Sequence, residues 1–304
     1  MQDHAADPAP GWLVEALAIE PELGELTVAG ARIETRAWGE RGRPGLLLIH
    51  GAGAHADWWR GLAPFFAETW RVAAFSLSGM GGSAWRERYS MDLYVEEAAA
   101  VAEAAGLFAA PVAPVVVAHS FGGRVALRWA AGSRAEAIRA AVLLDVMVRP
   151  PGVSIGRAPF DARNTRVYPS EAAILERYRL VPPQPAPIPA LLDMVAKGSI
   201  RPTEGGWRWR FDPDLWDRLE ERSTADDLRT AVRPVAAIRG ARSALMIPEV
   251  TRFFDETAPP GSPVVVVPEA HHHLMLDQPL ALVAALRGLL AGWPREAPPR
   301  EAPR

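Results

Sequence analysis

The stretch VVVAHSFGGRVAL (115–127) decides the fold. It passes from a continuously apolar run, typical of a strand buried on both faces, directly into a helix-compatible run. Between the two lies AHSFG (118–122), a small-x-Ser-x-small pentapeptide. Small residues two before and two after the serine permit a sharp strand-to-helix turn that exposes the hydroxyl. We therefore predict that Ser120 is a nucleophile. The alternative, a loop with a capping serine, fits the strand–turn–helix context less well.

Apolar runs of strand length and helical stretches alternate on both sides of this turn. Continuous apolar runs occupy 45–50, 71–77, 113–120, 140–146, 233–240 and 262–268. Helix signals, including a capping serine at Ser90, occupy 90–106, 121–132, 248–258 and 279–293. Residues 27–38 alternate around a glycine and predict an antiparallel hairpin. This order predicts an α/β fold with a mostly parallel central sheet flanked by helices.

The alternation stops between residues 149 and 230. This segment is rich in proline and tryptophan and has helix signals at 170–179, 190–197 and 213–222, but no buried-strand run. We predict a helical cap inserted into a core of residues 21–148 and 231–293, over the sheet edge where α/β proteins bind ligands. Residues 1–20 are interpreted as an N-terminal tail. Residues 294–304, a Pro/Arg/Glu/Ala repeat, are interpreted as a disordered tail.

Composition excludes several classes of protein. The chain of 304 residues has a formal net charge of −3 and no dense basic run, so no nucleic-acid partner is expected. It has no cysteine, which excludes disulfides and thiolate chemistry. No apolar run is long enough to cross a membrane, and the N-terminus has acids and prolines where a signal peptide would be basic and apolar. We predict a cytoplasmic protein without membrane association.

Three further segments make the resemblance to one family specific. LLLIHGAGAHADWW (46–59), SLSGMGGS (76–83) and VPEAHHHLMLDQP (267–279), together with the serine turn, resemble the α/β-hydrolase superfamily over nearly the whole chain. The resemblance implies an α/β-hydrolase fold, a structural role for His50, and His272 as the catalytic base. It also implies that the Ala52 N–H binds a developing oxyanion beside the Phe121 N–H. Ser76 and Met80 depart from the family's Asp-x-x-Gly-His-Gly-x-Ser loop.

Three adjacent histidines, 271–273, follow the last predicted strand. Adjacent side chains point in different directions, so a single turn cannot direct all three at one metal ion, and we expect neither a metal nor a cofactor. His271 and His273 are interpreted as loop packing or pocket lining, with one of them as the alternative base. Further candidates for substrate contact, with core packing as the alternative for the tryptophans, are Gly53, His119, Trp207, Trp209 and His273.

The acidic member of the expected catalytic set is not at its usual position. In many relatives the loop after the 233–240 strand reads Gly-x-x-Ser-Asp, but here Ala244 stands where the aspartate would be. Asp145 ends the preceding apolar run, and a buried carboxylate is costly without a partner such as an imidazole N–H. We predict Asp145 as the acid. The alternatives are that it caps the next turn or pairs with Arg149, with Glu269 and Asp277 as weaker candidates.

These residues predict a serine hydrolase that cleaves a small apolar or aromatic carboxylic ester or lactone. Carbon–carbon bond hydrolysis, thioester hydrolysis and perhydrolysis on the same scaffold remain alternatives. A non-catalytic ligand-binding homologue is the alternative from a different class. Dehalogenases and epoxide hydrolases of this superfamily have aspartate at the serine position, so Ser120 argues against both activities.

Overall fold

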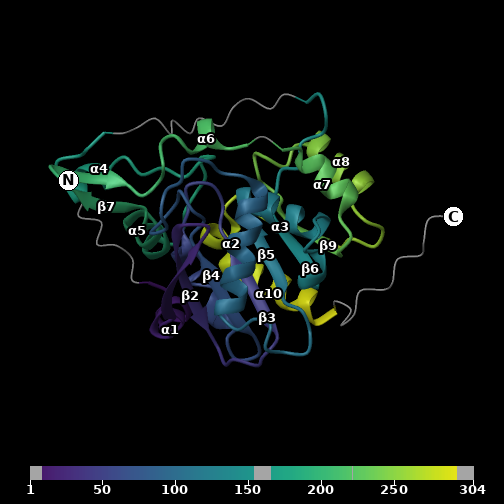
Figure 1. The fold of residues 1–304 in the computed structure, drawn as a ribbon. Coiled ribbons are helices and arrows are strands. Elements are labelled where there is room, and N and C mark those ends of the chain that lie inside the picture. The colour runs from purple at the N-terminus through teal and green to yellow at the C-terminus, as the bar shows by residue number, and fades with distance from the viewer. Residues whose placement is uncertain (1–8, 154–165, 221, 293–304) are drawn as a thin grey trace.

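The fold is built on one central sheet of eight strands in the order β1-β2-β4-β3-β5-β6-β9-β10 (Figure 1). The computed structural model describes residues 9–153, 166–220 and 222–292. The six predicted strands and the predicted hairpin are all present. Their bounds are β1 Glu22–Val28, β2 Ala31–Trp38, β3 Gly45–Ile49, β4 Arg71–Phe75, β5 Val115–His119, β6 Ala140–Leu144, β9 Val235–Gly240 and β10 Val264–Val267.

The sheet is mixed, and its parallel part positions the serine turn. Strands β4, β3, β5, β6, β9 and β10 pair in parallel, whereas β1 and β2 form the antiparallel hairpin and β2 runs antiparallel to β4. All residues of β3, β4, β5 and β6 are buried, as expected for strands covered on both faces. The carboxyl ends of β5 and β6 therefore lie side by side at one edge.

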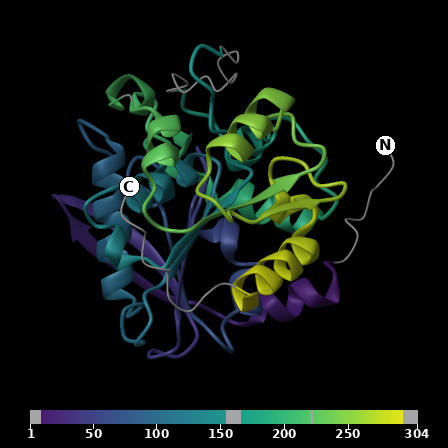
Figure 2. The same ribbon diagram turned by 90° about the vertical axis from the view of Figure 1, so that its right-hand side faces the viewer.

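Helices cover both faces of the sheet, and two apolar clusters result. One cluster joins the sheet to α2 (Met91–Ala104), α3 (Phe121–Ala131), α7 (Thr224–Thr230) and α8 (Pro248–Thr257). The other joins it to α1 (Gly11–Ala18), α9 (Leu274–Asp277) and α10 (Pro279–Gly292). Figure 2 shows α1 and α10 on one side of the sheet and the blue helices on the other. Short 3-10 turns lie at η1 Ala56–Trp59, η2 Ala63–Phe65 and η3 Ala135–Ala137.

Two boundaries differ from the sequence-based expectation. Within the predicted N-terminal tail, α1 folds onto the core, because Leu13 and Ala16 lie on one helical face and are buried. The predicted cap is also not purely helical. Besides α4 (Glu171–Leu175), α5 (Pro189–Gly198) and α6 (Leu215–Arg218), it contains an antiparallel hairpin of β7 (Ile200–Thr203) and β8 (Gly206–Trp209). This hairpin was missed because its strands are only half-buried and show no apolar run.

The inserted segment lies across the carboxyl edge of the sheet, above β5 and β6 in Figure 1. Several contacts fix it there. The His55 Nε2–H donates to the Val195 carbonyl (2.9 Å), and the Tyr89 hydroxyl donates to the Asp212 carboxylate (2.6 Å). Helix α7, by contrast, packs against α3 of the core. The expected tail 294–304 lies outside the described residues. Among the helices that the structure describes, none is long and apolar enough to cross a bilayer.

Candidate active site

Ser120 occupies a strained turn between β5 and α3. Its φ is 49° and its ψ is −116°, a conformation that non-glycine residues seldom adopt. The turn is fixed by the Ser120 N–H, which donates to the Leu144 carbonyl of β6 (3.0 Å). Close approach requires glycine at 122, because a Cβ there would lie 2.5 Å from the His50 carbonyl oxygen. The serine is only partly buried, and the free N–H groups of the first turn of α3 lie beside it.

A chain of hydrogen bonds links Ser120, His272 and Asp145, which are far apart in the sequence. Ser120 Oγ lies 3.0 Å from His272 Nε2, and His272 Nδ1 lies 2.8 Å from Asp145 Oδ2. A carboxylate can only accept here, so Nδ1 carries the proton and Nε2 is left to accept the serine proton. The imidazole and the carboxylate are both almost completely buried. The arrangement is therefore that of a serine activated by an oriented imidazole.

The end of β9 and the loop that follows it have no acid, but they donate two hydrogen bonds to Asp145. Asp145 Oδ1 accepts the Gly240 N–H (2.9 Å), and Asp145 Oδ2 accepts the Ser243 hydroxyl (2.5 Å) as well as the His272 imidazole. Three donors thus satisfy a carboxylate with no exposed surface. Sequence analysis missed Ser243. The signal was its position directly before Ala244, where relatives keep Ser-Asp.

The loop after β3 forms a tight turn whose Gly51–Ala52 peptide is contacted by His50. Gly51 to Ala54 form a turn closed by an Ala54 N–H to Gly51 carbonyl bond (3.3 Å), and Gly53 has a φ of 67°, which favours glycine. His50 Nδ1–H donates to the Gly51 carbonyl (2.7 Å). Because the peptide is trans and planar, the Ala52 N–H points away from that carbonyl. His50 thus orients the peptide without joining the Ser120–His272 chain.

Comparison with known proteins identifies the family of the chain. Residues 46–286 match the model of the alpha/beta hydrolase family. The chain is 30% identical over 289 residues to esterase Rv0045c of Mycobacterium tuberculosis, covering 89% of each chain. The chain belongs to the α/β-hydrolase family. This hydrolase is also 38% identical over 120 residues to lipase LipV of the same organism, covering 40% of this chain and 44% of that one.

Solved structures share the fold of this hydrolase. The thioesterase domain from the curacin biosynthetic pathway superimposes with a TM-score of 0.71 at 21% identity, covering 88% of this chain and 99% of that chain. A structure of the M. tuberculosis esterase Rv0045c superimposes with a TM-score of 0.68 at 22% identity, covering 92% and 97%. At these identities the likeness concerns the fold.

His119, predicted as a substrate contact, instead supports the histidine loop of the hydrolase. Its ring is 1% exposed, and its Nε2–H donates to the His272 carbonyl oxygen (3.0 Å). Burial, and then the neighbouring histidines, hold its pKa well below the usual value, so the ring stays neutral. This residue lies directly before Ser120 and fixes the main chain of His272.

His273 is also buried rather than open to a substrate. Its ring lies against Trp58 at a centroid distance of 5.2 Å, and burial holds its pKa well below the usual value. The inserted segment fixes its main chain, because Gln184 Oε1 accepts the His273 N–H (2.7 Å) and Gln184 Nε2 donates to the His273 carbonyl (3.4 Å). Gln184 has no motif around it, and sequence reasoning could not have found it.

The imidazoles of His119, His272 and His273 form a compact group. Within the described ranges, one ring nitrogen from each lies within 4.8 Å of the others. This is a different set from the adjacent histidines 271–273, so the argument from adjacent side chains does not apply to it. His272, however, already bonds Ser120 and Asp145 through its two nitrogens, and a metal ion bound to His272 would have to displace one of them. A metal at this group would therefore inhibit a serine-dependent reaction.

The remaining candidates lie elsewhere. Trp207 and Trp209 pack with Tyr168, Ile174 and Ile200 in a small cluster of the inserted segment. The tryptophan of the inserted segment beside the serine turn is Trp216, whose ring meets that of Phe121 edge to face at 5.4 Å. Two acids considered for the catalytic set are engaged by other partners: Asp277 accepts both the backbone N–H and the Nδ1–H of His271, and Glu269 is exposed and paired with Arg242.

Acid is expected to destabilise the protein through its buried histidines. Burial lowers the pKa of His50 to about 4, and burial is the main cause of the lowered pKa values of His55, His119 and His273. A histidine with a depressed folded pKa takes up a proton only on unfolding, so stability falls as pH drops from about 6.5 toward the folded pKa. For His50 alone, the full loss in the free energy of unfolding, reached below a pH of about 4, is on the order of 3 kcal/mol.

Urea unfolding at about pH 7.5 and about pH 5 measures this loss. Glu97 and Asp227, whose pKa values burial raises, oppose this loss, and we expect the four histidines to outweigh them. Equal or greater stability at the lower pH would contradict the assignment of these rings as neutral.

Proposed function

We propose that this α/β-hydrolase cleaves a carboxylic ester or lactone through an acyl-enzyme on Ser120. The observation that carries the proposal is the Ser120–His272–Asp145 chain of hydrogen bonds, with the serine at the start of α3. The similarity to an esterase over 89% of each chain supports the same substrate class. The carboxylate found beside His272 argues against a non-catalytic homologue that lost its acid.

The reaction then follows from the geometry. Ser120 Oγ attacks the carbonyl carbon while His272 Nε2 takes the hydroxyl proton, and the carbonyl electron pair moves onto its oxygen. The N–H groups of Ala52 and Phe121 hold this oxyanion. Asp145 stays ionised and stabilises the imidazolium. The alcohol leaves with the proton from His272. Water, deprotonated by His272, next attacks the acyl-enzyme, and Ser120 regains its proton as the acid departs.

The inserted segment serves as the cap and contributes one wall of the binding site. Its Trp216 packs against Phe121, which follows the nucleophile, and its Gln184 fixes the loop of the base. Apolar rings at this position favour an apolar or aromatic acyl or alcohol group. Trp216 therefore replaces Trp207 and Trp209 as the candidate tryptophan for substrate contact.

A panel of p-nitrophenyl esters with increasing acyl length, together with aromatic and aliphatic lactones and one acyl thioester, tests this proposal. We expect turnover of esters or lactones and a preference for apolar acyl groups. Labelling with a fluorophosphonate probe detects an activated serine even if the panel lacks the right substrate, because only an activated serine reacts quickly. Absence of both turnover and labelling in folded protein would refute the proposal.

A further inference from the structure

Three arginines of the inserted segment lie together, and no acidic partner is found for them in the part of the chain that the structure describes. Arg201 and Arg208 stand directly opposite each other on β7 and β8, and Arg210 follows β8. Within residues 9–153, 166–220 and 222–292, no carboxylate forms an ion pair with any of these three side chains. Like charges opposite each other destabilise a strand pair. Partial burial and then the charges of Arg208 and Arg210 lower the pKa of Arg201, in line with this crowding.

Two of these arginines face a pocket between the hairpin and the core. The pocket has a volume of about 430 Å³ and is lined by Arg201 and Arg210 from the inserted segment, by Arg32 and Glu34 from β2, and by residues 81–85 from the loop after β4. Three guanidinium groups and one carboxylate leave a net charge of +2 on the lining. Its volume lies within the usual range for small-ligand sites, about 300–1,000 Å³.

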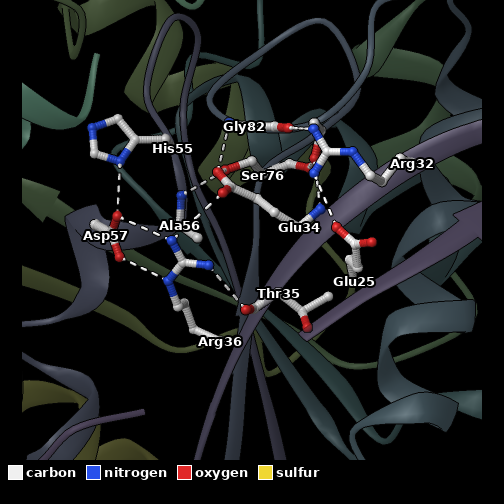
Figure 3. A network of polar contacts seen from close by, with 11 residues as sticks. Glu25, Arg32, Glu34, Thr35, Arg36, His55, Ala56, Asp57, Ser76 and Gly82 are labelled. Atoms are coloured by element: carbon white, nitrogen blue, oxygen red, sulfur yellow. Dashed lines mark hydrogen bonds and ion pairs between the residues drawn. The ribbon is translucent and has the colours of Figure 1, made fainter. Parts of the chain in front are cut away.

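The acid in this lining, Glu34, is engaged by Ser76 and Gly82, as Figure 3 shows. Glu34 Oε1 accepts the Ser76 hydroxyl and the Gly82 N–H, both at 2.6 Å, and Glu34 Oε2 faces Arg36 at 3.5 Å. Burial raises the pKa of Glu34, but these bonds and the charge of Arg36 outweigh it and keep the pKa below its usual value, so the group is ionised. Because Glu34 is engaged in these bonds, it holds the Gly82 backbone of the lining in place and does not neutralise the positive charges of Arg201 and Arg210.

Two of the three guanidinium groups that line the pocket, those of Arg32 and Arg201, are held in place before any ligand arrives. Arg32 donates to the Gly82 carbonyl at 2.7 Å and to Glu25 at 3.2 Å (Figure 3). The guanidinium carbons of Arg201 and Arg208 each lie 5.2 Å from the centre of the Trp85 ring, in cation–π contact. Preorganised guanidinium groups lose little side-chain entropy on binding and match the oxygens of phosphates and carboxylates.

We infer that this pocket binds a phosphate-bearing small molecule, with a dianionic phosphate group held by Arg32, Arg201 and Arg210. A net charge of +2 matches a phosphate monoester, and the volume leaves room for an attached organic group. Arg201 and Arg210 belong to the inserted segment and Arg32 to the sheet, so the bound anion joins the two parts. The site is separate from Ser120 and does not depend on the proposed hydrolytic activity.

Isothermal titration calorimetry of the intact protein at constant ionic strength tests the site, with inorganic phosphate and glycerol 3-phosphate as probes. We expect saturable binding in the millimolar range or tighter. The double variant Arg201→Ala/Arg210→Ala should weaken it by about tenfold or more, because charge-assisted hydrogen bonds are strong. The matched control is Arg179→Ala, an exposed arginine of the same segment whose guanidinium donates to the main-chain carbonyls of Glu176 and Tyr178. It should bind as the wild type does.

The two probes separate the possible sources of the phosphate. Tighter binding of glycerol 3-phosphate identifies a phosphate monoester, and equal binding identifies free phosphate; both support the site. Absence of saturable binding to the wild type overturns it, as does unchanged binding by a folded double variant. If circular dichroism shows that the double variant is unfolded, the single variants Arg201→Gln and Arg210→Gln take its place under the same criteria. The Ser120→Ala variant should bind both probes normally, which separates this site from the proposed function.

Discussion

Replacement of Ser120 by alanine should lower kcat for ester hydrolysis by a factor on the order of 10⁵–10⁶, with thermal stability nearly unchanged. The hydroxyl provides the attacking oxygen, and its removal takes away one part-buried hydrogen bond to His272 Nε2 but no apolar core contact. His272→Ala should cost about as much. Because the two groups act as a unit, the double variant should be scarcely worse than either single one. Stopped assays with an active p-nitrophenyl ester and fluorophosphonate labelling measure the effect.

His273→Ala is the matched control for this experiment. His273 is buried beside His272 but makes no bond to Ser120 among the contacts described here, and its main-chain bonds to Gln184 survive the substitution. We expect lower stability, because a buried ring is removed, with kcat per folded molecule far above that of His272→Ala. Loss of turnover in His273→Ala alone would show that the base has been assigned to the wrong histidine.

Asp145→Asn should lower kcat by roughly 10³–10⁴ while the fold is kept. In the wild type, Asp145 Oδ2 accepts the Nδ1–H of His272, so Nε2 is free to take the serine proton. An asparagine that turns its NH₂ toward Nδ1 would stabilise the opposite tautomer, with Nε2 protonated and unable to act as base. The Michaelis constant should change much less than kcat, because Asp145 is buried and does not contact a substrate.

Asp277→Asn provides the comparison for this variant. Asp277 is also a buried aspartate bonded to a histidine of the same loop, but its partner is His271, whose ring does not reach Ser120. We expect nearly normal kcat from Asp277→Asn, measured with the same ester on folded protein. Near-normal kcat in Asp145→Asn, or an equal loss in both variants, would refute the role of Asp145.

The absence of an acid after β9 was the sequence feature that pointed to Asp145 at the end of β6. Ala244 removes the usual carboxylate, and Asp145 was the one acid at the end of the neighbouring buried strand. Since β6 and β9 pair in parallel, their carboxyl ends meet at one edge, and either can present a group to the same imidazole. The Ser243 hydroxyl and the Gly240 N–H then donate to the carboxylate from the neighbouring loop.

Local patterns in the sequence determined the architecture of the hydrolase. Continuous apolar runs predicted the strands, because a strand covered on both faces must be apolar on both. The small residues around Ser120 predicted the tight turn, since only they let the backbone pass so closely to the His50 carbonyl. These features depend on residues near in sequence or on simple periodicity, and a single chain reveals them.

The tertiary structure alone decided what depends on residues distant in sequence. His119 supports the His272 carbonyl across 153 positions, Gln184 fixes the His273 main chain from the inserted segment, and Arg32 meets Arg201 and Arg210 across a pocket. No periodicity encodes these pairs, because each side chain is polar and could equally be solvated at the surface. Only folding brings these side chains together, and it decides which polar atoms find a partner and which charges remain unpaired.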